Sequence, residues 1–481
     1  VGSAGTDTIA LAGIGSVAIS AIESVVGSGV QDAVKLLATG SVGVTNVDTV
    51  IGTAGADTVT ILGSGPAVYV SSIESVVGTT ATGEIVKLMG ATAISVSAIE
   101  QVQGTVGAGD SVAMIGGTAV SVSVTNIEFA LGTTASGDVV VMMGAGTLSV
   151  SAVETVLGSV GADVVNMSAD GATLTVSGVE TVIGTAATDS VEILTGGGLS
   201  VSNVEVVTGT STSIEIVQLL APSTLSVSNV DTVVGSTGTD VVVQLGSGNL
   251  AVTNIETVVG TTGTADAVTL IGGSLKASDV ETLIGGTGSD TVTLLGSGIQ
   301  VYAADIDTLV GTSGTDVLTL LNSTPISVSS IETVVGGAGL DGITLLGGGT
   351  VAVSAVDSAV GTTSATDIVQ LLASPATNSL SVGNVETVVG STGTDIIVQM
   401  AAGTLSVSAV ETVVGSTGSS DLLRRGTAGV HVALSAVDTV VGTGAGNSDA
   451  IVMLATETIA VSALDSVIGS GGGDTVRILG G

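Results

Sequence analysis

Short runs of alternating apolar and polar residues recur along the whole chain. The segments Leu148–Ser151, Leu225–Ser228 and Leu405–Ser408 all read Leu-Ser-Val-Ser, which places apolar residues on one face of a strand and serines on the other. Glycine, Ser, Thr, Asn and Asp separate these runs. No 3.6-residue apolar period persists, so the pattern predicts strands joined by turns and no helix.

The runs are organised in a repeat that begins with a V/I-E/D-T/S-V-V/I-G phrase. The acidic residue of this phrase occurs eighteen times, 25 to 29 residues apart. A representative unit, residues 280–304, holds apolar segments at Leu283–Ile284, Val292–Leu295 and Ile299–Val301. We therefore expect about three short strands per coil, and hence three faces.

One repeat cannot bury its own apolar face, whereas stacked repeats build a continuous core. The prediction is an all-β fold, a single right-handed parallel β-solenoid of about eighteen coils. It forms one continuous domain over residues 1–481, and no separate caps are evident.

Acidic residues dominate the charge of the chain. There are 42 acidic residues against six basic ones, and the net charge of −36 excludes nucleic acid as a partner. A second acidic position follows about nine residues after the first; it occurs nineteen times, and the two positions together hold 37 of the 42 acidic residues.

We therefore expect two columns of charge, each with carboxylates about 4.8 Å apart in the stacked solenoid. Neighbouring carboxylates would then repel by about 1 kcal/mol in water and about 3.5 kcal/mol at an effective dielectric constant of about 20. Six basic residues cannot neutralise these columns. We therefore expect bound cations, and calcium suits ligands that are all oxygen.

The residues before the second acidic position resemble the calcium-binding RTX (repeats-in-toxin) family. Residues 285–293 and 336–344 match the nonapeptide G-G-x-G-x-D-x-U-x, and the looser G-x-x-G-x-D recurs nine times. The resemblance implies calcium held between successive turns by aspartate carboxylates and backbone carbonyls. A typical turn of that family is shorter and carries a loop on each edge, so one calcium column is implied here. The aspartates concerned are Asp7, Asp57, Asp163, Asp240, Asp290, Asp316, Asp341, Asp395 and Asp474.

The first acidic position has two interpretations. Its carboxylates are either solvated or hydrogen-bonded to a neighbouring coil, or they form a second column of metal ligands. The candidates for this metal or structural ladder are Glu23, Asp48, Glu74, Glu154, Glu180, Asp231, Glu256, Glu281, Asp307 and Glu332.

Two other functions need to be weighed against a structural one. Parallel β-helices also host polysaccharide-active enzymes, but such sites need clustered bases and aromatic residues that stack on sugars. Here Tyr69, Tyr302 and Phe129 are scattered, and His431 is the only histidine, so we expect no enzyme. The Ser and Thr rows could form an ice-binding face, although exposed strand faces commonly carry such residues.

The pattern as a whole favours a structural protein of the bacterial exterior, secreted or on the cell surface, stabilised by calcium. No run approaches the roughly eighteen apolar residues of a membrane-spanning helix. Both ends lie within the repeat, so we expect head-to-tail self-assembly into a filament or surface fibre. The alternative is a repeat segment of a larger adhesin or surface-layer protein. The basic pair Arg424 and Arg425 is a candidate lateral contact.

Overall fold

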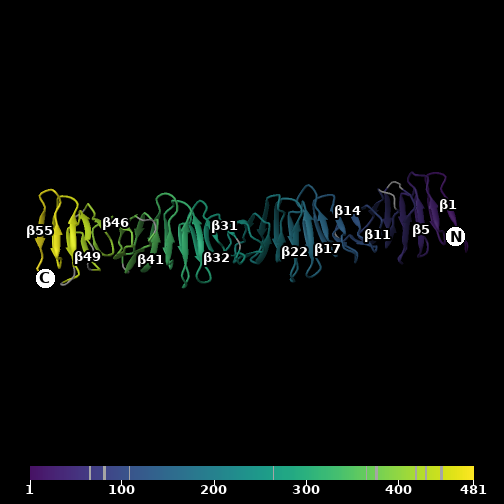
Figure 1. Cartoon of the computed structure of the whole chain (residues 1–481). Helices are drawn as coiled ribbons and strands as arrows, with labels where there is room; N and C mark the ends of the chain where they lie inside the picture. Colours follow the sequence, from purple (N-terminus) through teal and green to yellow (C-terminus); the bar gives the residue numbers. More distant parts are fainter. Residues whose placement is uncertain are drawn as a thin grey trace. The chain divides into compact units, whose positions relative to one another are not determined.

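The computed structural model describes residues 1–63, 67–79, 83–107, 109–263, 265–363, 366–373, 377–417, 420–427, 431–444 and 448–480. In this part of the chain all regular elements are β-strands. No described helix is long and apolar enough to cross a membrane. By their internal contacts the residues form two compact units, Val1–Val243 and Gln244–Gly481, each built of the same flattened turns (Figure 1).

The strands fall into two sets that alternate along the chain. The odd-numbered set, sheet A, consists of β1 (Thr8–Ala10), β3 (Ser24–Val26), β5 (Ser41–Thr45), β7 (Thr58–Ile61), β9 (Ser75–Val77), β11 (Ala93–Ser97), β13 (Ser111–Met114), β15 (Phe129–Leu131), β17 (Thr147–Ser151), β19 (Val164–Met167), β21 (Thr181–Ile183), β23 (Gly197–Ser202), β25 (Glu215–Leu219), β27 (Thr232–Val234), β29 (Asn249–Thr253), β31 (Ala267–Leu270), β33 (Thr282–Ile284), β35 (Gln300–Ala304), β37 (Val317–Leu320), β39 (Thr333–Val335), β41 (Gly349–Ser354), β43 (Asp367–Leu371), β45 (Thr387–Val389), β47 (Thr404–Ser408), β49 (Leu422–Arg425), β51 (Thr439–Val441), β53 (Thr458–Ser462) and β55 (Thr475–Ile478).

The even-numbered set, sheet B, consists of β2 (Ser16–Ile19), β4 (Ala33–Leu36), β6 (Thr49–Ile51), β8 (Val68–Ser71), β10 (Ile85–Leu88), β12 (Gln101–Gln103), β14 (Ser121–Thr125), β16 (Val139–Met142), β18 (Thr155–Leu157), β20 (Thr173–Ser177), β22 (Ser190–Ile193), β24 (Val206–Thr208), β26 (Thr224–Ser228), β28 (Val241–Gln244), β30 (Thr257–Val259), β32 (Gly273–Ser278), β34 (Asp290–Leu294), β36 (Thr308–Val310), β38 (Ile326–Ser329), β40 (Gly342–Leu345), β42 (Ser358–Val360), β44 (Thr377–Gly383), β46 (Thr394–Gln399), β48 (Thr412–Val414), β50 (His431–Ser435), β52 (Ala450–Met453) and β54 (Ser466–Ile468).

Each strand pairs in parallel with the strand two places further along the chain. Thus β34 pairs with β36 in sheet B, whereas β35 pairs with β37 in sheet A. One turn of the solenoid therefore contains two strands, and the described chain makes about 26 turns. The parallel β-solenoid is confirmed.

The predicted count of about eighteen coils and the three faces were wrong. A repeat does contain three strands, but a turn closes after two of them, so one repeat makes one and a half turns. The strand count could be obtained from local apolar runs. Which strands pair depends on packing between residues that are distant in sequence. Two stacked sheets bury both inner faces with fewer corners per turn than the predicted three-faced coil.

The three strands of a repeat differ in length and role. A short strand of three residues, such as β33, follows the first acidic position. A middle strand, such as β34, begins within one residue of the second acidic position. A longer alternating strand, such as β35, completes the repeat. Three corners join them: the glycine corner after the short strand, the long corner after the middle strand, and the tight corner after the alternating strand.

The core is a thin layer of β-branched and leucine side chains between the two sheets. Val140, Val156 and Val176 occupy one position in three successive turns, and at most 2% of each is exposed. Burying each such side chain is worth about 1.5 to 3 kcal/mol. Because every turn adds the same layer, stability accumulates by stacking.

The tight and glycine corners lie against each other in adjacent turns. Ser72, in a tight corner, has a φ of 51°, and the residue two before the first acidic position has a positive φ in the other repeats as well. A Cβ on Gly52, in the glycine corner one turn before, would lie 1.8 Å from the Ser72 carbonyl oxygen. Only glycine permits this approach of two backbones.

Candidate functional site: the acidic corners

The two acidic positions meet across adjacent turns. Glu332, in a tight corner, accepts a hydrogen bond of 2.8 Å from the backbone N–H of Asp316, in the glycine corner one turn before. The peptide N–H of Thr333 donates in return to the Asp316 carbonyl oxygen at 3.1 Å. The carboxylate and the peptide group therefore link adjacent turns by two hydrogen bonds.

This pairing recurs along the chain with distances of 2.7 to 2.9 Å. The pairs are Asp7–Glu23, Asp32–Asp48, Asp57–Glu74, Glu84–Glu100, Asp110–Glu128, Asp138–Glu154, Asp163–Glu180, Asp189–Glu205, Glu215–Asp231, Asp266–Glu281, Asp290–Asp307, Asp316–Glu332, Asp341–Asp357, Asp367–Glu386, Asp395–Glu411, Asp421–Asp438 and Asp449–Asp465. Nine of the ten ladder candidates are in these pairs, and Glu256 holds the same sequence position after Asp240.

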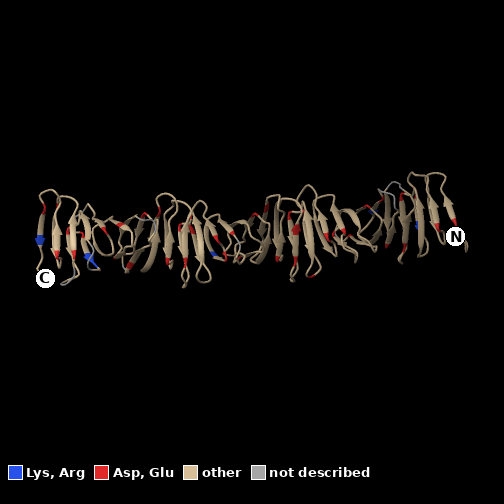
Figure 2. Ribbon diagram, viewed as in Figure 1, with Lys and Arg blue, Asp and Glu red and all other residues tan. Residues whose placement is uncertain are grey.

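The expected continuous columns of carboxylates are not formed. Because a repeat makes one and a half turns, successive repeats place the same acidic position on opposite edges. Asp316 directly precedes β37 of sheet A, whereas Asp290 begins β34 and Asp341 directly precedes β40, both of sheet B. The same position returns to one edge only after three turns, about 14 Å at the usual strand spacing. The acids are thus grouped in pairs, and the predicted repulsion between carboxylates spaced about 4.8 Å apart along a column does not arise. Figure 2 shows the acidic residues near the ends of strands and in the corners.

The second acidic position is held by hydrogen-bond donors from two turns. In the glycine corner of Asp316, the Thr312 hydroxyl donates to Oδ2 at 2.8 Å and the Thr312 N–H donates to the same oxygen. The N–H of Ile299, from the previous turn, donates to Oδ1 at 2.8 Å. Asp316 is fully buried. Burial acts to raise its pKa, but these hydrogen bonds from Thr312 and Ile299 lower the pKa overall.

A hydroxyl immediately after the first glycine of the corner supports most of the predicted metal aspartates. Seven of the nine accept a hydrogen bond from that Ser or Thr; these are Asp7, Asp57, Asp163, Asp240, Asp316, Asp395 and Asp474. Asp7 and Asp474 are half-buried and the other five are buried. This hydroxyl was not predicted, although its regular place after V-V-G is visible in the sequence.

Asp290 and Asp341 form the exception. Their corners are the two that match the full nonapeptide, and there Gly286 and Gly337 replace the hydroxyl residue. Oδ1 of Asp290 and both carboxylate oxygens of Asp341 are buried and have no hydrogen-bond partner among the described residues. At most 1% of either side chain is exposed.

The pKa values of these two aspartates move in the opposite direction from that of Asp316. Burial raises the pKa of Asp290, and the nearby Asp307 carboxylate adds to the rise. Burial likewise raises the pKa of Asp341, with Asp357 as its charged neighbour. Each is therefore a desolvated acid beside a second acid, which is an environment that a cation would stabilise.

The close backbone packing at Gly286 and Gly337 explains why neither position can hold a residue with a hydroxyl side chain. A Cβ on Gly286 would lie 2.7 Å from the Leu270 carbonyl oxygen, and a Cβ on Gly337 would lie 2.5 Å from that of Leu320. Both carbonyls belong to the preceding turn. The Gly286 N–H still donates to Oδ2 of Asp290 at 2.8 Å, so the donor that this corner lacks is the hydroxyl.

Three other buried acids also keep one oxygen without a partner, but they retain the hydroxyl. Glu84, Glu215 and Asp367 have an unpartnered carboxylate oxygen. The hydroxyls of Thr79, Thr210 and Thr362 donate to the other oxygens. Among the described residues no three His, Cys, Asp or Glu side chains converge on a metal-sized site.

The basic pair is divided between the core and the surface. Arg424 is exposed on β49, whereas Arg425 points inward and forms an ion pair of 3.1 Å with Asp449, both side chains being at most 2% exposed. His431 is exposed at the start of β50. Arg425 thus supplies a local counter-charge to one acidic corner.

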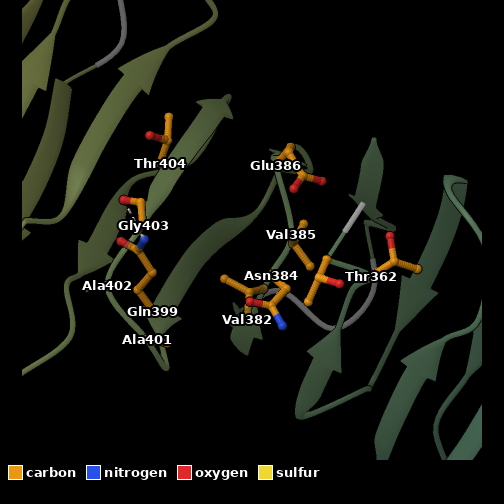
Figure 3. A pocket seen from close by; sticks show the side chains of 11 residues that line it. Thr362, Val382, Asn384, Val385, Glu386, Gln399, Ala401, Ala402, Gly403 and Thr404 are labelled. Atoms are coloured by element: carbon orange, nitrogen blue, oxygen red, sulfur yellow. Dashed lines mark hydrogen bonds between the residues drawn. The ribbon is translucent and has the colours of Figure 1, made fainter. Parts of the chain in front are cut away.

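A recurring hollow lies along the edges, where three successive turns present a glycine, a tight and a long corner. One such hollow, with a volume of about 210 Å³, is lined by Thr362, Glu386 and Gln399 among others (Figure 3). Gln399 donates to the Gly403 carbonyl oxygen at 3.2 Å. Glu386 is the only ionisable side chain among the described residues that line this hollow.

No family model, no curated protein and no solved structure matches this chain. The resemblance to RTX repeats therefore depends on the motif alone.

Proposed function

We propose that this chain is a structural protein of the bacterial exterior, a β-solenoid stabilised by calcium. The observation that carries the proposal is that the recurring acidic residues are used between turns. In seventeen acid pairs a carboxylate accepts a hydrogen bond from a backbone N–H of the adjacent turn. The recurring acidic residues therefore stabilise the stacking of turns.

The resemblance to RTX repeats supports calcium as the cation, and the donor sets suggest where it binds. In seven of the nine motif corners a Ser or Thr hydroxyl and backbone N–H groups serve the aspartate. Asp290 with Asp307, and Asp341 with Asp357, would hold calcium, because Oδ1 of Asp290 and both carboxylate oxygens of Asp341 are buried without a donor and each aspartate adjoins a second acid. A bound cation would neutralise each pair.

The solenoid would act either as a filament assembled head to tail or as the repeat segment of a larger adhesin or surface-layer protein. Parallel pairing in the same register from turn to turn favours assembly, because two copies could pair by the hydrogen bonds that join turns within one copy. Electron microscopy of the purified chain separates the two: filaments support assembly and single particles support the segment.

Thermal unfolding with calcium or with a chelator tests the proposed stabilisation. We expect the midpoint to rise with calcium concentration and to fall when EDTA removes it, with magnesium much less effective. Equal midpoints in calcium and in EDTA would refute the calcium part and leave the structural role standing.

A further inference from the structure

The charged residues are unevenly distributed over the surface of the first unit. We define the A face as the outward side chains of the odd-numbered strands from β1 to β27. All fourteen strands are described, and none of these outward side chains is charged. The opposite B face, on the even-numbered strands, carries Lys35, Lys87 and Glu192.

The A face consists mainly of small or β-branched side chains. Ser95, Ser149 and Ser200 are outward, half-buried residues at the centres of β11, β17 and β23. Larger apolar residues interrupt these rows: Leu131 is 38% exposed and Ile216 is 42% exposed. Such a surface can approach another sheet closely without burying a charge.

The acidic edges restrict how two copies can meet. The paired acids lie in the corners, at the margins of each sheet (Figure 2). An edge-to-edge contact would bring like charges together, whereas a contact between two A faces keeps the carboxylates at its margins in solvent.

The size of the face matches a specific interface. Fourteen strands at about 4.8 Å, each about 13 Å wide, present roughly 850 Å², and a stable interface buries about 800 Å² per partner. We propose that two copies of this chain associate laterally, A face against A face, about a two-fold axis. This inference rests on the proposed structural function and names its partner, a second copy.

Matched triple variants test the face. Ser95→Lys, Ser149→Lys and Ser200→Lys place three charges on the A face, whereas Ser123→Lys, Thr175→Lys and Ser226→Lys place three at the equivalent half-buried positions of the B face. Both variants change the net charge equally. Circular dichroism checks that each remains folded, and sedimentation equilibrium measures association at high salt, which screens the net charge of −36.

We expect the wild type and the B-face variant to associate with similar dissociation constants. The dissociation constant of the A-face variant should be higher by a factor of about a hundred or more. A wild type that stays monomeric at all concentrations, or two variants equally impaired, would overturn the proposal. So would an effect of the wild-type monomer on ice growth that the A-face variant alone loses. Running each arm in calcium and in EDTA separates failure of this contact from failure of calcium stabilisation.

Discussion

The Glu332 carboxylate accepts a hydrogen bond of 2.8 Å from the backbone N–H of Asp316, one turn away. Neither residue needs a cation for this contact. The pair shows how a chain with 42 acidic and six basic residues can form a packed fold. Backbone N–H groups donate to its carboxylates where other proteins would use basic side chains.

Thr312 should stabilise its corner through its hydroxyl. Thr312→Val removes the donor to a buried carboxylate while keeping the shape, and we expect a local loss of about 1 to 3 kcal/mol. Hydrogen exchange of the amides in this corner measures the loss. Thr308→Val, at an outward half-buried position of β36, is the matched control and should change little. Similar protection in the two variants would contradict the assigned role.

Asp290 and Asp341 should respond to neutralisation differently from Asp316. Without calcium, the raised pKa means that ionisation of each aspartate opposes folding at neutral pH, so Asp290→Asn and Asp341→Asn should preserve or raise the unfolding midpoint. Asp316→Asn should lower it, because the pKa of Asp316 is lowered by its hydrogen bonds.

The same variants should differ in how much calcium raises their unfolding midpoints. Calcium should raise the midpoint of the wild type and of Asp316→Asn, but not of the Asp290→Asn, Asp341→Asn double variant. A double variant that gains as much from calcium as the wild type would show that the ions bind elsewhere.

The strand pattern was predicted correctly because the alternation of apolar and polar residues is a local property of the sequence. Alternation in Leu148–Ser151 sets the inward and outward sides of β17, as found. The number of strands per turn depends on which distant strands pair, so the three faces were wrong. Asp316 and Glu332 are separated in sequence by about one turn. This spacing reveals the length of a turn only once the two residues are known to be hydrogen-bonded to each other, and the sequence does not show that contact.

Within the corners, the sequence located the acids but not their donors. The N–H of Ile299 that reaches Asp316 belongs to the preceding turn, and only the register of stacking shows this contact. In contrast, the replacement of hydroxyl by glycine at Gly286 and Gly337 is visible in the sequence. Its meaning depends on the buried oxygens of Asp290 and Asp341.

Asp32 should make the fold acid-sensitive. Burial acts to raise its pKa, but hydrogen bonds from Ser28 and Gly15 lower it overall. The unfolded chain therefore takes up the proton first as pH falls, so the stabilisation by Asp32 is present above its ordinary pKa and is lost through the lowered folded value. Asp32→Asn should lower the unfolding midpoint at pH 7, and the difference should vanish in strong acid. A difference independent of pH would refute it.

Gly52 should tolerate no side chain. A Cβ there would lie 1.8 Å from the Ser72 carbonyl oxygen, so Gly52→Ala should separate two turns locally and cost several kcal/mol, on the order of other severe steric changes. Gly90→Ala is the control, because a Cβ at Gly90 meets nothing within 4 Å. Limited proteolysis should cut the Gly52→Ala variant near this corner. Equal resistance of the two variants would argue against the observed close approach.

The number of calcium ions bound per chain tests the central claim most directly. Equilibrium dialysis of the full chain with radioactive calcium should give two tightly bound ions, one at Asp290 and one at Asp341. The Asp290→Asn, Asp341→Asn double variant should bind none. About nine ions, one for each glycine-rich motif, or no binding to the wild type, would contradict the account.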